Sequence, residues 1–147
     1  MKRKYFWMVG LLLVLVLALA ACGGGSNTAA SPADAVAAAE GELNLPDTVD
    51  PQTVAQIKDR ADVVVFDVRE QYEYDEAHIP GVTLIPLGDL PNRLSEIPTD
   101  KTVIMTCRSG NRSGQATDFL RQNGYTNVHN MAGGIVAWQQ AGLPVEQ

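Results

Sequence analysis

The run VVVFDV at residues 63–68 most constrains what this chain can fold into. It is apolar at almost every position instead of at alternate ones, which is typical of a parallel strand buried on both faces. The run TVIMT at residues 102–106 has the same character. Strands of this kind need helices over both faces, so we expect an α/β fold with a mainly parallel sheet between two layers of helices.

Shorter segments alternate with these two runs, as such a fold requires. Asp50 followed by Pro51 is a typical helix start, and a short helix is expected there. Further helices or helical turns are expected at residues 71–77, 91–97, 113–123 and 135–140, and further strands at 82–85 and 125–131. Gly124 stands where a helix over 113–123 would end.

The segment CRSGNRS at residues 107–113 joins the second apolar run to a predicted helix. A strand, a short turn and a helix start direct successive backbone amides and the helix dipole at one point, which is the usual construction of an anion cradle. Cys107 occupies that point, at the carboxyl end of a strand, where ligands of α/β folds gather. The amides and the guanidinium groups of Arg108 and Arg112 favour thiolate over thiol, so we predict a nucleophilic cysteine.

The first residues of the chain have the composition of an export signal. Basic residues 2–4 precede an apolar run over 5–21, and small residues and Cys22 follow. The sequence LAAC at 19–22 resembles a bacterial lipobox, which implies cleavage before Cys22 and attachment of lipid, such as palmitate, to that cysteine. The alternative is an uncleaved anchor, since 17 residues reach the lower limit for crossing a bilayer.

This leader divides the chain into three parts. We expect a lipoprotein signal peptide at 1–21, a lipidated Cys22 with a flexible tether at 22–42, rich in Gly, Ser and Ala, and one folded domain at 43–147. Either interpretation of the leader attaches the domain to the cell membrane on the extracytoplasmic side, at the periplasmic face or the cell surface.

Cysteine usage favours a chemical role for the remaining thiol. If Cys22 carries lipid, Cys107 has no partner for an internal disulfide. A lone thiol outside the cytoplasm is exposed to oxidation and is usually avoided. A buried, inert cysteine is the alternative, but the residues around Cys107 are polar and charged.

Charge and composition exclude other classes of function. The net charge is −6, and three of the 11 basic residues lie in the leader, so the mature chain is still more acidic and unsuited to nucleic acid. The two histidines, His78 and His129, belong to no cluster with zinc spacing, so no metal site is predicted. Nothing in the sequence calls for a cofactor.

Four motifs, in order over about residues 46–145, resemble the single-domain rhodaneses, a family of sulfurtransferases. They are DVR at 67–69, HIPG at 78–81, the cysteine loop at 107–113, and GG at 133–134 with Trp138 and GLPV at 142–145. The resemblance implies the rhodanese-like three-layer α/β fold. It also implies that Cys107 takes a sulfane sulfur from thiosulfate or a persulfide and passes it to cyanide or a thiol.

The resemblance assigns the rest of the loop to substrate binding. These residues are Arg108, Ser109, Gly110, Asn111, Arg112 and Ser113. Their inward amides would stabilise thiolate and persulfide alike, since both are anions. For Arg112 a structural part is the favoured interpretation, in which its forked donors tie the loop to the helix that follows it.

The other polar residues receive supporting roles. Asp67 and Arg69 are expected to form an ion pair or to brace a loop, and His78 to be a hydrogen-bonded structural histidine, with general base as its alternative. The carboxylates Glu70, Glu73, Asp75 and Glu76 are interpreted as a solvated face.

Two alternatives to a sulfurtransferase remain. The first is phosphoryl transfer, because phosphatases have a related cysteine loop. Those phosphatases place five residues between cysteine and arginine, whereas four separate Cys107 from Arg112, so the tighter ring favours sulfur over phosphate. The second alternative is a non-catalytic or carrier module that binds a partner protein or senses oxidants. The sequence leaves the oligomeric state open.

Overall fold

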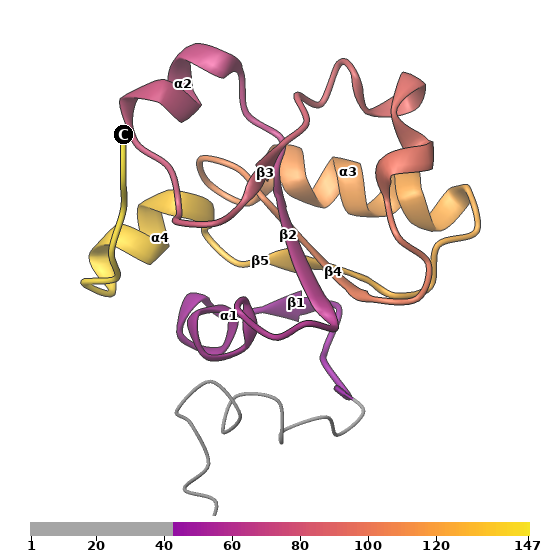
Figure 1. Cartoon of the computed structure of the whole chain (residues 1–147), viewed down its shortest axis with the longest axis horizontal. Coiled ribbons are helices and arrows are strands. Elements are labelled where there is room, and N and C mark those ends of the chain that lie inside the picture. Colours follow the sequence, from indigo (N-terminus) through magenta and orange to yellow (C-terminus); the bar gives the residue numbers. More distant parts are fainter. Residues whose placement is uncertain (1–42) are drawn as a thin grey trace, which may run out of the picture.

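The computed structural model describes residues 43–147 (Figure 1). The predicted signal peptide, Cys22 and the tether lie outside the described residues. Within the described part, no helix is long and apolar enough to span a bilayer.

Five parallel strands form one sheet in the order β1-β5-β4-β2-β3. The two apolar runs are its centre: β2 (Val63–Asp67) pairs with β4 (Thr102–Thr106) along its whole length. The outer strands are β1 (Thr48–Val49), β3 (Thr83–Leu84) and β5 (Val128–Met131). All carboxyl ends of the strands therefore lie at one edge of the sheet.

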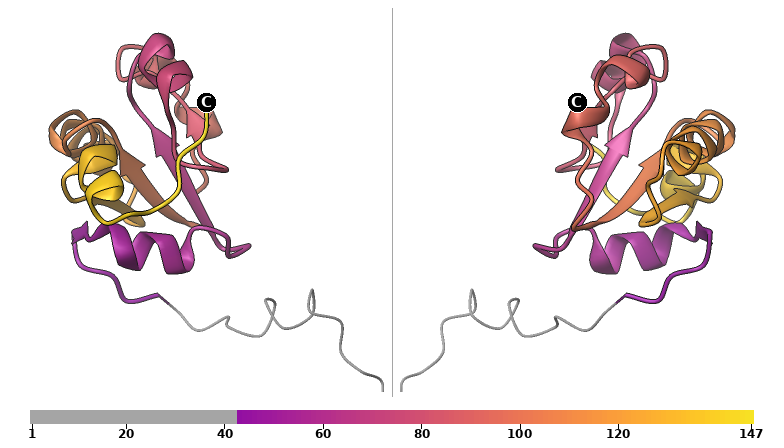
Figure 2. Two further views of the ribbon diagram at one scale, coloured as in Figure 1. Left: turned by 90° about the vertical axis from the view of Figure 1, so that its left-hand side faces the viewer. Right: turned by 90° about the vertical axis from the view of Figure 1, so that its right-hand side faces the viewer.

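Helices cover both faces of this sheet, which confirms the predicted three-layer α/β fold. On one side lie α1 (Pro51–Ile57) and α4 (Gly134–Gln140), and on the other lies α3 (Asn111–Gln122) (Figure 1). The short α2 (Gln71–Glu76) follows β2 and lies at the opposite end of the molecule from α1 (Figure 2). It thereby lies near the edge where the strands end.

Two apolar clusters fix these layers. The first includes Val54, Ile57, Val65, Ile104, Ile135 and Trp138. The second includes Phe66, Val103, Met105, Cys107, Ala116 and Leu120. Side chains of the two central strands alternate between the clusters, so these strands are buried on both faces as their composition predicts.

Short or irregular elements differ from expectation. β1 was not predicted, because two residues carry no periodic signal. The short helical segment expected at 91–97 is present as two 3₁₀ helices, Leu90–Asn92 and Leu94–Glu96, and not as one continuous α-helix. The last strand begins at Val128 instead of 125, because residue 125 still closes the end of α3 through its amide.

Candidate active site

The cysteine loop connects β4 to α3 in a single tight turn. Gly110 precedes the helix with φ +92°, a left-handed conformation that favours glycine. Its carbonyl accepts the amide of Gly114 at 3.0 Å, which opens α3. This turn brings two donors to Cys107 Sγ: the Gly110 amide at 3.1 Å and the Ser113 hydroxyl at 3.3 Å.

Hydrogen bonds dominate the electrostatics of Cys107. Its side chain is 1% exposed, and this burial raises the pKa of the thiol. The Ser113 hydroxyl and the amides of Ser113, Ser109 and Gly110 outweigh burial, so the pKa of Cys107 lies below that of an ordinary cysteine. The loop therefore stabilises a thiolate with neutral donors.

The first residues of α4 hydrogen-bond to the backbone of the cysteine loop. The amide of Ile135 donates to the Cys107 carbonyl at 2.8 Å, and that of Val136 to the Arg108 carbonyl at 3.1 Å. A Cβ on Gly134 would lie 2.2 Å from the Cys107 carbonyl oxygen, so only glycine allows this approach. The two glycines at 133–134 have φ of +67° and +56°, which explains the GG motif as a strand-to-helix turn.

One residue of β5 also holds the loop. Asn130 donates its side-chain amide to the Gly110 carbonyl at 3.2 Å. This contact could not be predicted from the sequence, because a polar residue in a predicted strand gives no sign of which segment it faces.

The two loop arginines differ in their surroundings. Arg112 makes a bidentate ion pair with Glu73 of α2, with N···O distances of 2.6 and 2.7 Å. Its hydrogen bonds lower the pKa of Glu73 to about 2 and raise the pKa of Arg112. The side chain of Arg108 is exposed and has no hydrogen bond or ion pair with any described residue.

The prediction that Glu73 belongs to a solvated face is wrong. Its side chain is only 13% exposed, because it pairs with the loop arginine and accepts the Glu70 amide at 3.1 Å in a capping box. Arg112 does brace the loop, but against α2, 39 residues earlier in the chain. Ser109 and Asn111, also assigned to substrate binding, lie exposed on the loop.

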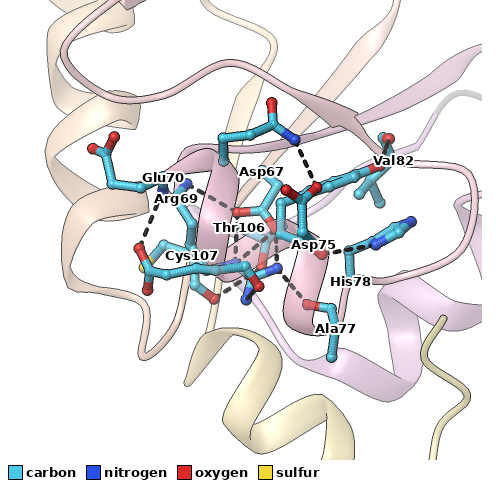
Figure 3. Close-up of polar contacts among 12 residues, drawn as sticks. Asp67, Arg69, Glu70, Asp75, Ala77, His78, Val82, Thr106 and Cys107 are labelled. Atoms are coloured by element: carbon cyan, nitrogen blue, oxygen red, sulfur yellow. Dashed lines mark hydrogen bonds and ion pairs between the residues drawn. The ribbon is translucent and has the colours of Figure 1, made fainter. Parts of the chain in front are cut away.

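Asp67 and Arg69 form the ion pair that the sequence analysis predicts. Both residues are buried, and Arg69 Nε donates to Asp67 Oδ2 at 2.8 Å. Figure 3 shows dashed lines from the side chain of Arg69 to Asp67 and to Ala77. Its guanidinium also donates to the carbonyls of Ala77 at 2.8 Å and Glu73 at 3.1 Å, which fixes α2 against the end of β2.

His78 has the surroundings of a structural histidine. Its ring stacks on Tyr74 with centroids 3.8 Å apart, and Nδ1 lies 2.9 Å from the Tyr74 carbonyl. Nε2 lies 3.3 Å from a carboxylate oxygen of Glu146, and the backbones of these two residues also pair. His78 thus joins the end of α2 to the last residues of the chain.

Comparison with known proteins assigns this arrangement to a family. The Rhodanese-like domain profile matches residues 50–141, from the cap of α1 to the end of α4. The chain belongs to the rhodanese family. The match includes the cysteine loop and, within residues 43–147, every helix and strand except β1. It covers the first three sequence motifs and the Gly133, Gly134 and Trp138 part of the fourth, while GLPV at 142–145 follows its end.

Relatives of this rhodanese include proteins with sulfur-transfer names. A sulfurtransferase from Allochromatium vinosum is 42% identical over 98 residues, which cover 66% of this chain and 92% of that protein. A thiosulfate sulfurtransferase from Pseudoalteromonas translucida is 31% identical over 86 residues, 58% of this chain and 82% of that protein. Two longer relatives, from Synechocystis and Bacillus subtilis, are spanned over only 54% and 59% of their lengths.

A solved structure supports the same assignment. The crystal structure of a rhodanese-related protein from Thermoplasma volcanium matches 69% of this chain and 98% of its own, with 31% identity and a TM-score of 0.63. Family and relatives together support sulfurtransferase activity in general, with a sulfur donor and a sulfur acceptor as substrates.

A hollow of about 240 Å³ adjoins the loop of this rhodanese, between α2 and α4. It is lined by Arg69, Glu73, Glu76, Ala77, Arg108, Ile135, Val136 and Gln139. Within residues 43–147, no group of three or more His, Cys, Asp or Glu side chains could hold a metal ion. The hollow lies next to the cysteine loop, from which Arg108 contributes to its lining.

Proposed function

We propose that the protein is a membrane-tethered sulfurtransferase. It moves a sulfane sulfur from thiosulfate or a persulfide to cyanide or a thiol, through a persulfide on Cys107. The observation that carries this proposal is the pair of donors, the Gly110 amide and the Ser113 hydroxyl, that converge on Cys107 Sγ. Neutral donors of this kind stabilise an anionic sulfur before and after it is loaded.

In the first half-reaction, the Cys107 thiolate attacks the outer sulfur of the donor. With thiosulfate, a bond forms between Sγ and that sulfur, the sulfur–sulfur bond of thiosulfate breaks, and sulfite leaves with the electron pair. One thiolate and one thiosulfate dianion become one persulfide anion and one sulfite dianion, so charge balances without an oxidant. We expect the exposed Arg108, which lines the hollow next to the loop, to attract such an anion.

The second half-reaction needs an acceptor from outside. Cyanide or a thiolate attacks the outer sulfur of the persulfide, and Cys107 leaves as thiolate. Cys107 is the free cysteine of the described residues, so no second thiol of this part of the chain can resolve the persulfide as an internal disulfide. The sulfur must therefore pass to another molecule.

The position of Arg112 supports sulfur transfer over phosphoryl transfer. Both forks of its guanidinium are occupied by Glu73, whereas phosphate in a cysteine cradle needs free donors for its oxygens. This agrees with the short spacing between Cys107 and Arg112.

The membrane tether is part of the same proposal. It rests on the basic, apolar and LAAC segments of the leader, with Cys22 as the lipidated residue and an extracytoplasmic location for the domain. Membrane fractionation tests it: we expect the wild-type protein in membranes, with lipid on Cys22 by mass spectrometry. An unmodified Cys22 in the mature protein would overturn the lipid anchor.

Sulfur loading tests the proposed reaction. A purified chain beginning after Cys22 is incubated with thiosulfate, and its intact mass is measured. We expect a gain of one sulfur atom, and release of thiocyanate when cyanide is added. The Cys107→Ser variant should show neither, with activity at least about a thousandfold lower.

The outcomes separate the alternatives. Absence of both the mass gain and thiocyanate would overturn the enzyme. Loading by persulfide without turnover of thiosulfate would favour the carrier module, and full activity of Cys107→Ser would overturn the role of that residue.

A further inference from the structure

The hollow between α2 and α4 adjoins the reactive cysteine through backbone contacts. Ile135 lines it and donates its amide to the Cys107 carbonyl, while Arg108 lines it as the next residue of the loop. Its volume of about 240 Å³ suits a molecule of few heavy atoms. A sulfur acceptor of that size can bind in this hollow, next to the loop that carries Cys107.

Most of the charge around this hollow is already compensated. Arg69 is paired with Asp67 and bonded to two carbonyls, and Glu73 is paired with Arg112. Charges that are paired in this way form part of the lining but interact only weakly with a ligand.

Two opposite charges of the lining have no such partner. Arg108 extends from the cysteine loop and Glu76 from the last turn of α2, and neither side chain forms a hydrogen bond or ion pair with any described residue. Both are exposed, so a ligand can reach them. An apolar surface, including the 36% exposed Val136, belongs to the same lining.

This combination does not fit the donor. Thiosulfate is a dianion that Arg108 attracts, but a free carboxylate at Glu76 repels it. Cyanide has neither a carboxylate to pair with Arg108 nor an ammonium group to pair with Glu76. A ligand that uses both residues carries a carboxylate and an ammonium group on a short apolar carbon chain.

We propose that the acceptor of this sulfurtransferase is a zwitterionic aminothiol, with its carboxylate on Arg108 and its ammonium group on Glu76. This inference rests on the proposed function, since it names the molecule that discharges Cys107. The acceptor thiolate attacks the outer sulfur, a new sulfur–sulfur bond forms, and the bond to Sγ breaks. The products are the persulfide of the acceptor and the Cys107 thiolate, with no net oxidation.

A series of thiols tests the two contacts separately. The full-length protein, purified in detergent, is loaded with thiosulfate and freed of excess donor, and loss of the added sulfur is followed by intact mass. The acceptors are L-cysteine, cysteamine without the carboxylate, 3-mercaptopropionate without the amine, and neutral 2-mercaptoethanol. Each rate is compared between variants for the same thiol, which cancels differences in thiol pKa.

The Glu76→Gln variant gives the decisive comparison. We expect discharge by L-cysteine and by cysteamine to slow about two- to fivefold, as for one exposed ion pair, while 3-mercaptopropionate reacts no more slowly than with the wild type. The Arg108→Gln variant should instead slow L-cysteine and 3-mercaptopropionate, but not cysteamine. Asp75→Asn is the matched control, because Asp75 is exposed on α2 outside the hollow, and all four rates should stay unchanged.

Two results would overturn the inference. The first is that Glu76→Gln slows all thiols equally or none of them, and the second is that Asp75→Asn has the same effect as Glu76→Gln. Failure of the proposed function looks different: the wild-type protein would then not load sulfur, or would release it to none of the four thiols.

Discussion

Two neighbouring regions of this rhodanese differ in how their charged groups are stabilised. In the cysteine loop, residues 107–113, the sulfur of Cys107 accepts from an amide and a hydroxyl, and no cation among the described residues is paired with it. In the ion-pair cluster, defined as Asp67, Arg69, Glu73 and Arg112, every charge has an opposite partner within 2.7 Å.

The difference separates charged groups that stabilise the fold from the sulfur that can react. Paired charges in the cluster hold α2 against β2 and the loop. Neutral donors in the loop stabilise an anion without binding it as a permanent ion pair, so the sulfur can be loaded and released. Four predictions test this division, from the largest expected effect to the smallest.

Removal of the most buried cation should break the cluster. Arg69→Ala leaves the 1% exposed Asp67 without its partner, which should lower the free energy of unfolding by about 3–5 kcal/mol. Urea denaturation measures this loss. Arg93→Ala is the control, because the pair of Arg93 with Glu96 is exposed and should cost about 1 kcal/mol or less. Equal losses would contradict a structural role for the buried pair.

The backbone support of the loop should be almost as sensitive. Gly134→Ala places a Cβ 2.2 Å from the Cys107 carbonyl oxygen, so we expect a loss of about 3 kcal/mol or more and slower sulfur loading. Gly142→Ala has a similar φ of +72° with nothing within 4 Å, and should cost only about 1–2 kcal/mol. If both variants lose the same free energy of unfolding, the positive φ alone explains the loss. The close approach of Gly134 to the Cys107 carbonyl would then contribute nothing.

The second pair of the cluster should respond to pH. The folded pKa of Glu73 is about 2, below its ordinary value of 4.5, so this group stabilises the fold above about pH 4.5 and loses that contribution as the pH falls towards 2. Glu73→Gln should cost about 1–3 kcal/mol at pH 7, with the difference from wild type shrinking between pH 5 and 2. Urea denaturation at each pH measures it.

A matched carboxylate gives the control for that prediction. Glu76 has no partner among the described residues, so Glu76→Gln should change the stability by less than about 0.5 kcal/mol at any of these pH values. A pH-independent loss in Glu73→Gln would contradict the ion pair as its cause.

The smallest effect is expected within the loop itself. Ser113→Ala removes the hydroxyl donor, so the pKa of Cys107 should rise and alkylation by iodoacetamide at pH 7 should slow about tenfold. The measurement is the pH dependence of the alkylation rate. Ser109→Ala is the control, since Ser109 acts through its backbone amide, and an equal slowing there would contradict the role of the hydroxyl.

Local patterns determined most of the fold. The apolar runs of β2 and β4, the Asp50 cap of α1 and the Gly124 end of α3 each depend on residues close in sequence, and all lie where predicted. The Asp67–Arg69 pair was also predictable, because its members are two residues apart at the end of a strand.

Only the tertiary structure decided how the loop is held. Glu73 meets Arg112 across 39 residues, and Asn130 reaches Gly110 across 20. Gly134 lies against the peptide of Cys107, and Arg108 and Glu76, which pair with no described residue, line one hollow. The sequence shows that these residues are polar or small, but the packing of α2 and α4 around the ends of the strands selects their partners. A local pattern carries no information about that choice, because it depends on which elements become neighbours in space.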